Sequence, residues 1–297
     1  MESRLLSLRF PAGGSLYYCK DLQDKSSWID IPSTLPTSKG HFCIGPNTTL
    51  GLWYGKRRDL SVGRGPYIDS LAALTAGAKK EIAHLTKFGR PLQPLRRLRR
   101  EIYNYQAQSH FEHIASLEKY LQIAPYLIPQ NNSAITRPVM RHPDLQPNNI
   151  FVSDKLEITG LIDWQHSVVL PLFLQCGIPN SLQNYGDEVS ESLQIPCLPD
   201  NFNNLEEREQ FEQAQLLRRR QLHHFYVNFT AKYNSEHYDA LTSDLSTLRR
   251  RLFHHASNPW EGDNTSLKAN RSFEGLGKGG SSGEATLPNF VYRGRVG

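Results

Sequence analysis

The sequence predicts an α+β fold in which a mostly helical body carries one small β-hairpin. Apolar residues recur every three or four positions in several long segments, which is typical of amphipathic helices. Two short β-rich runs flank turn residues near the middle of the chain, and further β-rich runs lie near the N-terminus. With 297 residues, the chain is long enough to bury a sizeable core.

The N-terminal region predicts the remnant of a small sheet. Two strands are expected at Leu5–Phe10 and Leu16–Cys19, joined by a turn at Gly13 and Gly14. A stretch rich in Ser, Pro, Gly and Thr follows from about residue 24 to 66, with one further strand at His41–Ile44. Long connections of this kind inside compact domains are usually functional or mobile.

The first long helix is predicted from about Asp69 to Phe88. Gly89 should end it by adopting a left-handed backbone conformation. The apolar stripe that predicts this helix consists of Leu71, Leu74, Ala78, Ile82 and Leu85.

Three more helices complete the predicted body. One begins at Ser109, which should form a capping box with Glu112, and Pro125 should end it. Two longer helices are expected at about 205–229 and 237–255.

Composition excludes several classes of protein. The chain is 38% hydrophobic and 21% charged, which excludes a collagen-like, fibrous or wholly disordered chain, and no apolar run approaches the ~18 residues of a membrane helix. The net charge of +5 comes largely from arginine clusters at 96–100, 218–220 and 249–251. We interpret them as solvated helix faces; without interleaved aromatic residues they do not favour nucleic-acid binding. The four cysteines form no Cys-x-x-Cys pair and are predicted to be reduced thiols.

The predicted hairpin, 150–152 and 158–162, has chemistry-bearing residues at both ends. Before it, His142 to Asn149 has the form His-x-Asp-x-x-x-x-Asn, which includes Asp144. After it comes Asp163, 14 residues beyond Asn149. Because the two strands return the chain to its starting end, these three oxygen-bearing side chains should lie at one end of the hairpin.

The residue types suit a magnesium site. Mg²⁺ prefers hard oxygen ligands, usually one or two carboxylates together with substrate phosphates, and Asn149 and Asp163 fit that role. Asp144 can orient a substrate hydroxyl and accept its proton. A weaker alternative is a transition-metal site of a hydrolase, made by His142, Asp144, Asp163 and His166.

This arrangement resembles the catalytic loop and metal-binding aspartate of the aminoglycoside phosphotransferase family. Longer segments resemble its fungal branch named altered inheritance of mitochondria protein nine, over about residues 5 to 269. The segments that carry the resemblance are Arg141–Ser153, Gly160–His166, Gln183–Asp187 and Pro259–Asp263.

The resemblance implies a protein-kinase-like fold of two lobes and ATP- and Mg²⁺-dependent phosphoryl transfer to an unknown small molecule. It makes Asp144 the catalytic base, Asn149 and Asp163 the Mg²⁺ ligands, and His142 a residue that stabilises the loop. The backbone at Tyr18 and Cys19 would be the hinge that meets the adenine.

Part of the family pattern is missing. No Gly-rich phosphate loop precedes the first strands, and Lys20 lies on the wrong side of the expected hinge. We therefore expect residues 1–23 to be the remnant of an incomplete N-terminal lobe, 24–269 a helical C-terminal lobe, and 270–297 a disordered tail.

Two main functions stay open at this point, beside a third and weaker one, a basic RNA-associated protein that would bind through the arginine cluster at 96–100. The first is a phosphotransferase, expected to have little or no activity in this chain; the second is a catalytically dead, kinase-like scaffold or regulator. The name of the fungal branch implies a mitochondrial location, with the cytoplasm as the alternative. The sequence does not predict the oligomeric state.

Overall fold

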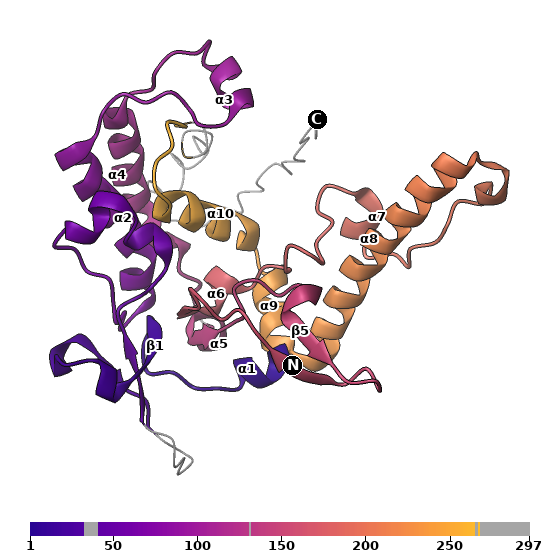
Figure 1. Cartoon of the computed structure of the whole chain (residues 1–297), viewed down its shortest axis with the longest axis horizontal. Coiled ribbons are helices and arrows are strands. Elements are labelled where there is room, and N and C mark those ends of the chain that lie inside the picture. The colour runs from indigo at the N-terminus through magenta and orange to yellow at the C-terminus, as the bar shows by residue number, and fades with distance from the viewer. Residues whose placement is uncertain (33–40, 131, 265–266, 268–297) are drawn as a thin grey trace, which may run out of the picture. The chain divides into compact units, whose positions relative to one another are not determined.

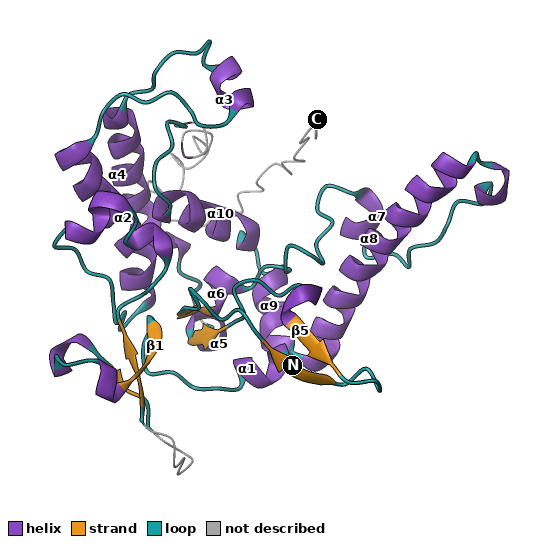
Figure 2. Cartoon of the chain, viewed as in Figure 1, coloured by secondary structure: helices purple, strands orange, loops and turns teal. Residues whose placement is uncertain are grey.

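The computed structural model describes residues 1–32, 41–130, 132–264 and 267 (Figure 1). Helices dominate and the strands are short (Figure 2), so the predicted α+β class is confirmed. The helices are α1 (Glu2–Leu6), α2 (Ser70–Phe88), α3 (Arg97–Ile102), α4 (His110–Leu127), α5 (Ser133–Thr136), α6 (Leu172–Gln175), α7 (Glu188–Glu191), α8 (Glu207–Tyr233), α9 (Ser235–Thr242) and α10 (Ser246–Ser257). The strands are β1 (Ser15–Tyr18), β2 (Ile29–Asp30), β3 (Phe42–Gly45), β4 (Pro138–Met140), β5 (Ile150–Val152), β6 (Ile158–Leu161) and β7 (Val169–Pro171).

The described residues form two compact units. The first unit consists of Met1–Pro143, Trp164–Gly177 and the described residues from Asp239 onward. The second unit consists of Asp144–Asp163 and Ile178–Tyr238. The predicted tail, 270–297, lies outside the described residues.

The first unit contains a small antiparallel sheet in the order β1-β3-β2. Tyr17 of β1 lies opposite Cys43 of β3, and Asp30 of β2 lies opposite Cys43 from the other side. The predicted strands at 16–19 and 41–44 are therefore confirmed within one or two residues. The sheet joins β1, from the predicted remnant 1–23, to two strands that follow it in the chain.

The predicted strand at Leu5–Phe10 is wrong, because residues 2–6 form α1. Leu6 is buried in a cluster with Val139 and Leu172, and Glu2 accepts a hydrogen bond from Arg141 Nε at 3.0 Å. These partners lie more than 130 residues away in the chain, so a local pattern of alternating residues could not reveal them.

The core of the first unit lies between α2, α4 and α10, and α2 and α4 run side by side (Figure 1). Asp69 caps α2 by accepting a hydrogen bond from the backbone N–H of Ala72 at 2.7 Å. The predicted span of this helix is confirmed. The buried residues shared by the three helices and α6 are Leu74, Ala78, Leu117, Tyr120, Leu127, Phe173, Leu174, Leu252 and Ala256.

Gly89 ends α2 as predicted, but for a different reason. Its φ is −61°, so its backbone is not left-handed. A Cβ atom at this position would overlap the His110 ring and the Leu85 carbonyl. Close approach of α4 therefore requires the glycine, and the conformational argument is wrong.

The predictions for the ends of α4 need two corrections. Ser109 occupies the N-cap position, but its side chain makes no capping hydrogen bond. Pro125 lies inside the helix, which continues to Leu127. Because Leu127 is buried in the core, tertiary packing holds the last turn in place beyond the proline.

The long helix predicted at 237–255 is divided into α9 and α10. Leu245, directly before α10, has a φ of 60°, which interrupts the helix. The break allows α10 to place Leu252 and Ala256 in the core with α2 and α4. The other long helix, predicted at 205–229, is confirmed as α8, which begins with a capping box between Glu206 and Glu209.

Within the described residues, no helix is long and apolar enough to cross a membrane. The four cysteines all lie in this part of the chain and form no disulfide, as predicted.

Candidate functional site

The hairpin of β5 and β6 brings the two predicted metal ligands to one end. Ile150 pairs with Leu161, and the backbone N–H of Ile162 donates to the Asn149 carbonyl at 3.1 Å. This last bond extends the ladder by one step beyond the strands. Asn149 and Ile162 are therefore opposite each other, and Asp163 follows directly.

The loop before the hairpin is closed on itself by Asn149. This residue is buried, and its Nδ2 donates to the Asp144 carbonyl at 2.8 Å and to Asp144 Oδ2 at 3.3 Å. Gln146 Nε2 also donates to Asp144 Oδ2, at 2.6 Å. Two side-chain amides thus fix the orientation of the Asp144 carboxylate, which is exposed to solvent.

Asp163 has an unusual backbone conformation. Its φ is 64°, a left-handed angle that non-glycine residues rarely adopt, although Asp tolerates it better than most. Backbone strain of this kind occurs often at functional sites. The side chain of Asp163 is exposed.

We call the segment Asp144–Asp163 the catalytic hairpin, after its predicted role. Its oxygen donors Asp144, Asn149 and Asp163 suit Mg²⁺. Because Asn149 uses Nδ2 for Asp144, its Oδ1 is the atom that could serve as a ligand, beside the carboxylate of Asp163. In the part of the chain that the structure describes, no group of three or more His, Cys, Asp or Glu side chains could hold a metal ion. The alternative of a transition-metal site at His142, Asp144, Asp163 and His166 is therefore not supported.

The residues on either side of the catalytic hairpin belong to the first unit. His142 is buried, and its ring meets the Trp164 ring edge to face at 4.6 Å between centroids. This packing fits a residue that holds the loop in place.

The predicted hinge lies at the end of β1. Tyr18 is partly exposed and stacks on Phe42 at 4.7 Å between ring centroids. The backbone N–H of Cys19 donates to the His41 carbonyl at 2.9 Å. In this structure the Cys19 amide therefore extends the pairing of β1 with β3.

A pocket of about 360 Å³ in the first unit was missed by sequence reasoning. Its volume falls in the range of small-molecule sites. Its residues come from five separate segments, so no local sequence signal could have found it. The lining residues are Leu5, Ser15, Leu16, Thr48, Met140, Trp164, His166, Ser167 and Val169.

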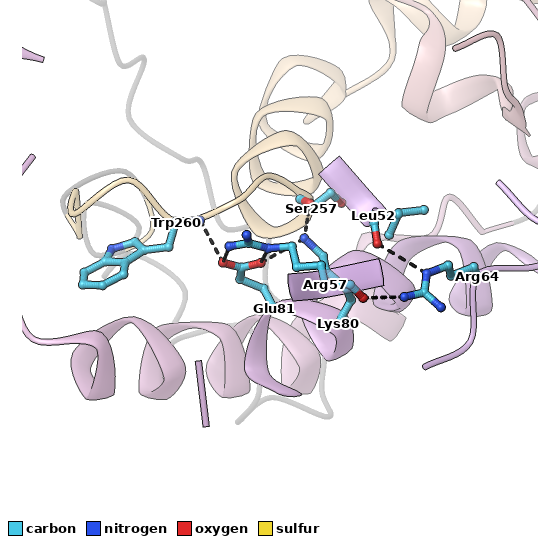
Figure 3. Close-up of polar contacts among 7 residues, drawn as sticks. All are labelled: Leu52, Arg57, Arg64, Lys80, Glu81, Ser257 and Trp260. Atoms are coloured by element: carbon cyan, nitrogen blue, oxygen red, sulfur yellow. Dashed lines mark hydrogen bonds and ion pairs between the residues drawn. The ribbon is translucent and has the colours of Figure 1, made fainter. Parts of the chain in front are cut away.

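A second cluster of charges lies in the first unit (Figure 3) and is made by Arg57, Lys80 and Glu81. Glu81 accepts from Arg57 Nε at 2.7 Å, from Lys80 Nζ at 3.0 Å and from the backbone N–H of Trp260 at 2.8 Å. We call these three charged residues the buried charge cluster. Lys80 and Glu81 have no exposed surface, so a substrate cannot reach them.

The surroundings of Glu81 favour its charged form. Burial by itself would raise the pKa of Glu81, but hydrogen bonds from Arg57 and the charge of Lys80 outweigh it and lower the pKa to about 2. Burial lowers the pKa of Lys80. Shifted pKa values often mark active sites. Lys80 and Glu81 are fully buried, however, so here the shifts result from the packing of the core.

Comparison with known proteins gives one family match. Residues 66–173 match the phosphotransferase enzyme family (APH). This segment contains Asp144, Asn149 and Asp163. No solved structure gives a significant match to the chain.

Two groups of fungal proteins are similar to the chain. A subtelomeric hrmA-associated cluster protein of Aspergillus fumigatus is 29% identical over 300 residues, which cover 91% of this chain and 56% of that protein. Altered inheritance of mitochondria protein 9, mitochondrial, of Lachancea thermotolerans is 24% identical over 262 residues, which cover 84% of this chain and 41% of that protein. The chain spans about half the length of the hrmA-associated relatives.

Proposed function

We propose that the chain, whose residues 66–173 match the phosphotransferase enzyme family (APH), transfers a phosphoryl group from ATP to a hydroxyl group of a small molecule, with Mg²⁺ as cofactor. The resemblance to this family that the sequence predicted is confirmed. The resemblance to altered inheritance of mitochondria protein 9 is also present, at lower identity than that of the hrmA-associated proteins.

The observation that carries the proposal is the geometry of the catalytic hairpin. Asn149 is hydrogen-bonded to Asp144, and the strand pairing brings Asn149 next to the residue that precedes Asp163. Three residues with different chemical roles are thereby held by one short supersecondary unit, so their mutual arrangement depends little on the rest of the fold.

Each residue has a distinct role in the proposed reaction. Asn149 Oδ1 and the Asp163 carboxylate would hold Mg²⁺, which would supply positive charge to neutralise the transferred phosphoryl group. Asp144 orients the acceptor hydroxyl and accepts its proton, which contributes on the order of 10²–10⁴ in rate. Gln146 holds Oδ2 of Asp144 and is a positioning residue.

The wider architecture in the proposal is that of a two-lobed kinase. Residues 1–23, with Tyr18 and Cys19 as the hinge, contribute to the N-terminal lobe, 24–269 form the C-terminal lobe, and His142 supports the catalytic loop. The pocket lined by Leu16 and Met140 offers apolar walls of the kind that bind a nucleobase. The mitochondrial name of the more distant relatives supports a mitochondrial location, with the cytoplasm as the alternative.

One observation favours the alternative function, a kinase-like scaffold without catalysis. The Cys19 amide, which would face the adenine at the hinge, donates to the His41 carbonyl. A scaffold would keep the fold of the catalytic hairpin and bind no Mg²⁺–ATP.

Calorimetric titration with ATP, with and without Mg²⁺, tests the proposal. We expect sub-millimolar binding that depends on Mg²⁺ and is lost in Asp163→Asn. Asp154→Asn is the matched control, because Asp154 is an exposed carboxylate in the turn of the same hairpin. Asp144→Asn should bind Mg²⁺–ATP normally and lose phosphoryl transfer to a pool of hydroxyl-bearing metabolites.

Two outcomes would contradict the proposal. If the wild-type chain binds no Mg²⁺–ATP, the scaffold function is supported. If Asp154→Asn weakens binding as much as Asp163→Asn, the bound metal is not held by the predicted ligands.

A further inference from the structure

The connection between α2 and α4 forms a surface of unusual composition. It runs from 90 to 108 and carries the short helix α3 at one end of the α2–α4 pair (Figure 1). Between Arg90 and Ile102 the sequence has five arginines and a single acidic residue, Glu101. The segment therefore carries a formal charge of +4 within thirteen residues.

Large aliphatic side chains of this segment point to solvent. Leu95 is 57% exposed, Leu98 is 68% exposed and Ile102 is 59% exposed. Leu98 and Ile102 are four residues apart on α3, so they lie on the same face of the helix. We call these three residues the aliphatic patch.

Exposed arginines border the aliphatic patch. Arg96 and Arg97 directly precede Leu98 and are both exposed. Arg97 pairs with Glu101 at 3.2 Å, but this ion pair is open to solvent and therefore weak. The long side chains of Arg96 and Arg97 can lie along an apolar surface while their guanidinium groups stay in water.

Arg99 and Arg100 have partners within the first unit. Arg99 Nε pairs with Asp263 Oδ2 at 3.1 Å. Arg100 Nε donates to the Pro94 carbonyl at 2.6 Å and its Nη2 to the Leu95 carbonyl at 3.2 Å. The inner arginines thus fix the backbone.

Hydrogen bonds between the two ends of the connection also support it. Leu92 and Gln108 exchange backbone hydrogen bonds at 3.1 and 2.9 Å, and Gln93 Nε2 donates to the Tyr105 carbonyl at 2.6 Å. The segment is therefore built with its apolar side chains facing outward, although exposing them is unfavourable in water.

We propose that the aliphatic patch, together with Arg96 and Arg97, is a docking surface for the anionic face of a lipid bilayer. A bilayer interface accepts aliphatic side chains at the boundary of the acyl chains and arginines among anionic headgroups. Single-stranded nucleic acid is typically bound by several stacking aromatic side chains, whereas Tyr105 is a single exposed aromatic residue beside the exposed Leu98 and Ile102. A tyrosine also suits the interface of a bilayer.

Flotation with lipid vesicles tests this surface in the full chain. We expect binding to vesicles of an equal mixture of phosphatidylcholine and phosphatidylglycerol, weak binding to pure phosphatidylcholine, and weaker binding at high salt. The double variant Arg96→Gln, Arg97→Gln should reduce the affinity for the mixed vesicles by roughly 25-fold, at about fivefold for each arginine.

The aliphatic patch is tested separately by Leu98→Gln with Ile102→Gln. Both side chains lie on the surface, so the fold should be retained, which circular dichroism checks. This variant keeps every charge, and we expect at least about a tenfold loss of vesicle binding because apolar burial is lost.

Two matched controls come from the second unit. Arg218→Gln with Arg219→Gln removes the same charge from exposed positions of α8. Leu156→Gln with Ile195→Gln removes two apolar side chains that are 82% and 83% exposed. Both control variants should bind the mixed vesicles as the wild-type chain does.

Three results would overturn the proposal. The first is the absence of binding to the mixed vesicles. The second is an equal loss of binding in the control variants. The third combines two observations: single-stranded RNA binds tightly through Arg96 and Arg97 but not through Leu98 and Ile102, and Leu98→Gln with Ile102→Gln has no effect on vesicle binding. This surface would then be a nucleic-acid site.

Discussion

The catalytic hairpin and the buried charge cluster use similar side chains in opposite surroundings. In the hairpin, Asp144 and Asp163 are exposed, and Asp163 has a left-handed backbone. In the cluster, Lys80 and Glu81 have no exposed surface, and Glu81 is bound by two cations and a backbone N–H. Exposed carboxylates can meet a metal ion or a substrate, whereas Glu81 has all its partners inside the protein.

The difference shows what a polar group contributes in each place. A buried ion pair adds little net stability by itself, but the loss of one partner leaves an uncompensated charge in the core. An exposed carboxylate is stabilised by water, so its replacement changes chemistry much more than folding. Substitutions in the buried charge cluster should therefore lower the free energy of unfolding much more than substitutions in the catalytic hairpin.

The largest effect on stability is expected for Glu81→Gln. The substitution leaves Arg57 and Lys80 charged and buried without a carboxylate, so the free energy of unfolding should fall by about 3–5 kcal/mol. Urea-induced unfolding measures it. Glu212→Gln, which breaks the exposed ion pair with Arg208, is the control and should change stability by less than about 0.5 kcal/mol.

The same cluster should make stability depend on pH. Because the pKa of Glu81 is lowered to about 2 in the folded chain, its contribution is complete above the ordinary pKa of a glutamate and is lost as the pH falls toward 2. The difference in unfolding free energy between the wild-type chain and Glu81→Gln should therefore shrink between about pH 5 and pH 2. A constant difference over this range would contradict a charged Glu81 in the folded state.

A smaller effect is expected for Gly89→Ala at the end of α2. The added Cβ would overlap the His110 ring and the Leu85 carbonyl, so we expect a loss of about 1–3 kcal/mol in thermal or urea unfolding. Gly160→Ala in the catalytic hairpin is the control, because its Cβ would only touch Phe151 at 4.0 Å. Equal losses in both variants would mean that the hairpin is packed as tightly as the helical core.

The smallest effect on stability is expected for Gln146→Ala. Its hydrogen bond to Asp144 lies at the surface, so the free energy of unfolding should change by less than about 0.5 kcal/mol. Phosphoryl transfer should nevertheless slow, with Mg²⁺–ATP binding unchanged, because the Asp144 carboxylate is less well oriented. A parallel loss of ATP binding would show that Gln146 acts on the nucleotide site.

Several features of the molecule were predictable because they depend on neighbours in the chain. The span of α2, the hairpin and the strand β3 follow from apolar spacing and turn residues, and the structure has all of them. The choice of Asp144, Asn149 and Asp163 also followed from sequence, because the spacing of a hairpin sets which residues meet at its end.

Other features depend on residues far apart in the chain. Lys79 is exposed and Lys80 is completely buried, although both belong to the same polar stretch of α2. The partners that decide this are Ser257 and, through Glu81, Trp260. No periodicity within α2 reveals them.

By itself, the sequence determined the α+β class, the main helix and hairpin, and the set of oxygen donors at the predicted catalytic loop. Only the tertiary structure decided that Glu2–Leu6 is helical, that the last long helix is divided near Leu245, and that Lys80 and Glu81 lie in the core. The physical reason is range: helix periodicity and turn preference act over a few residues. Burial and ion pairing instead depend on contacts between segments that only the folded chain brings together.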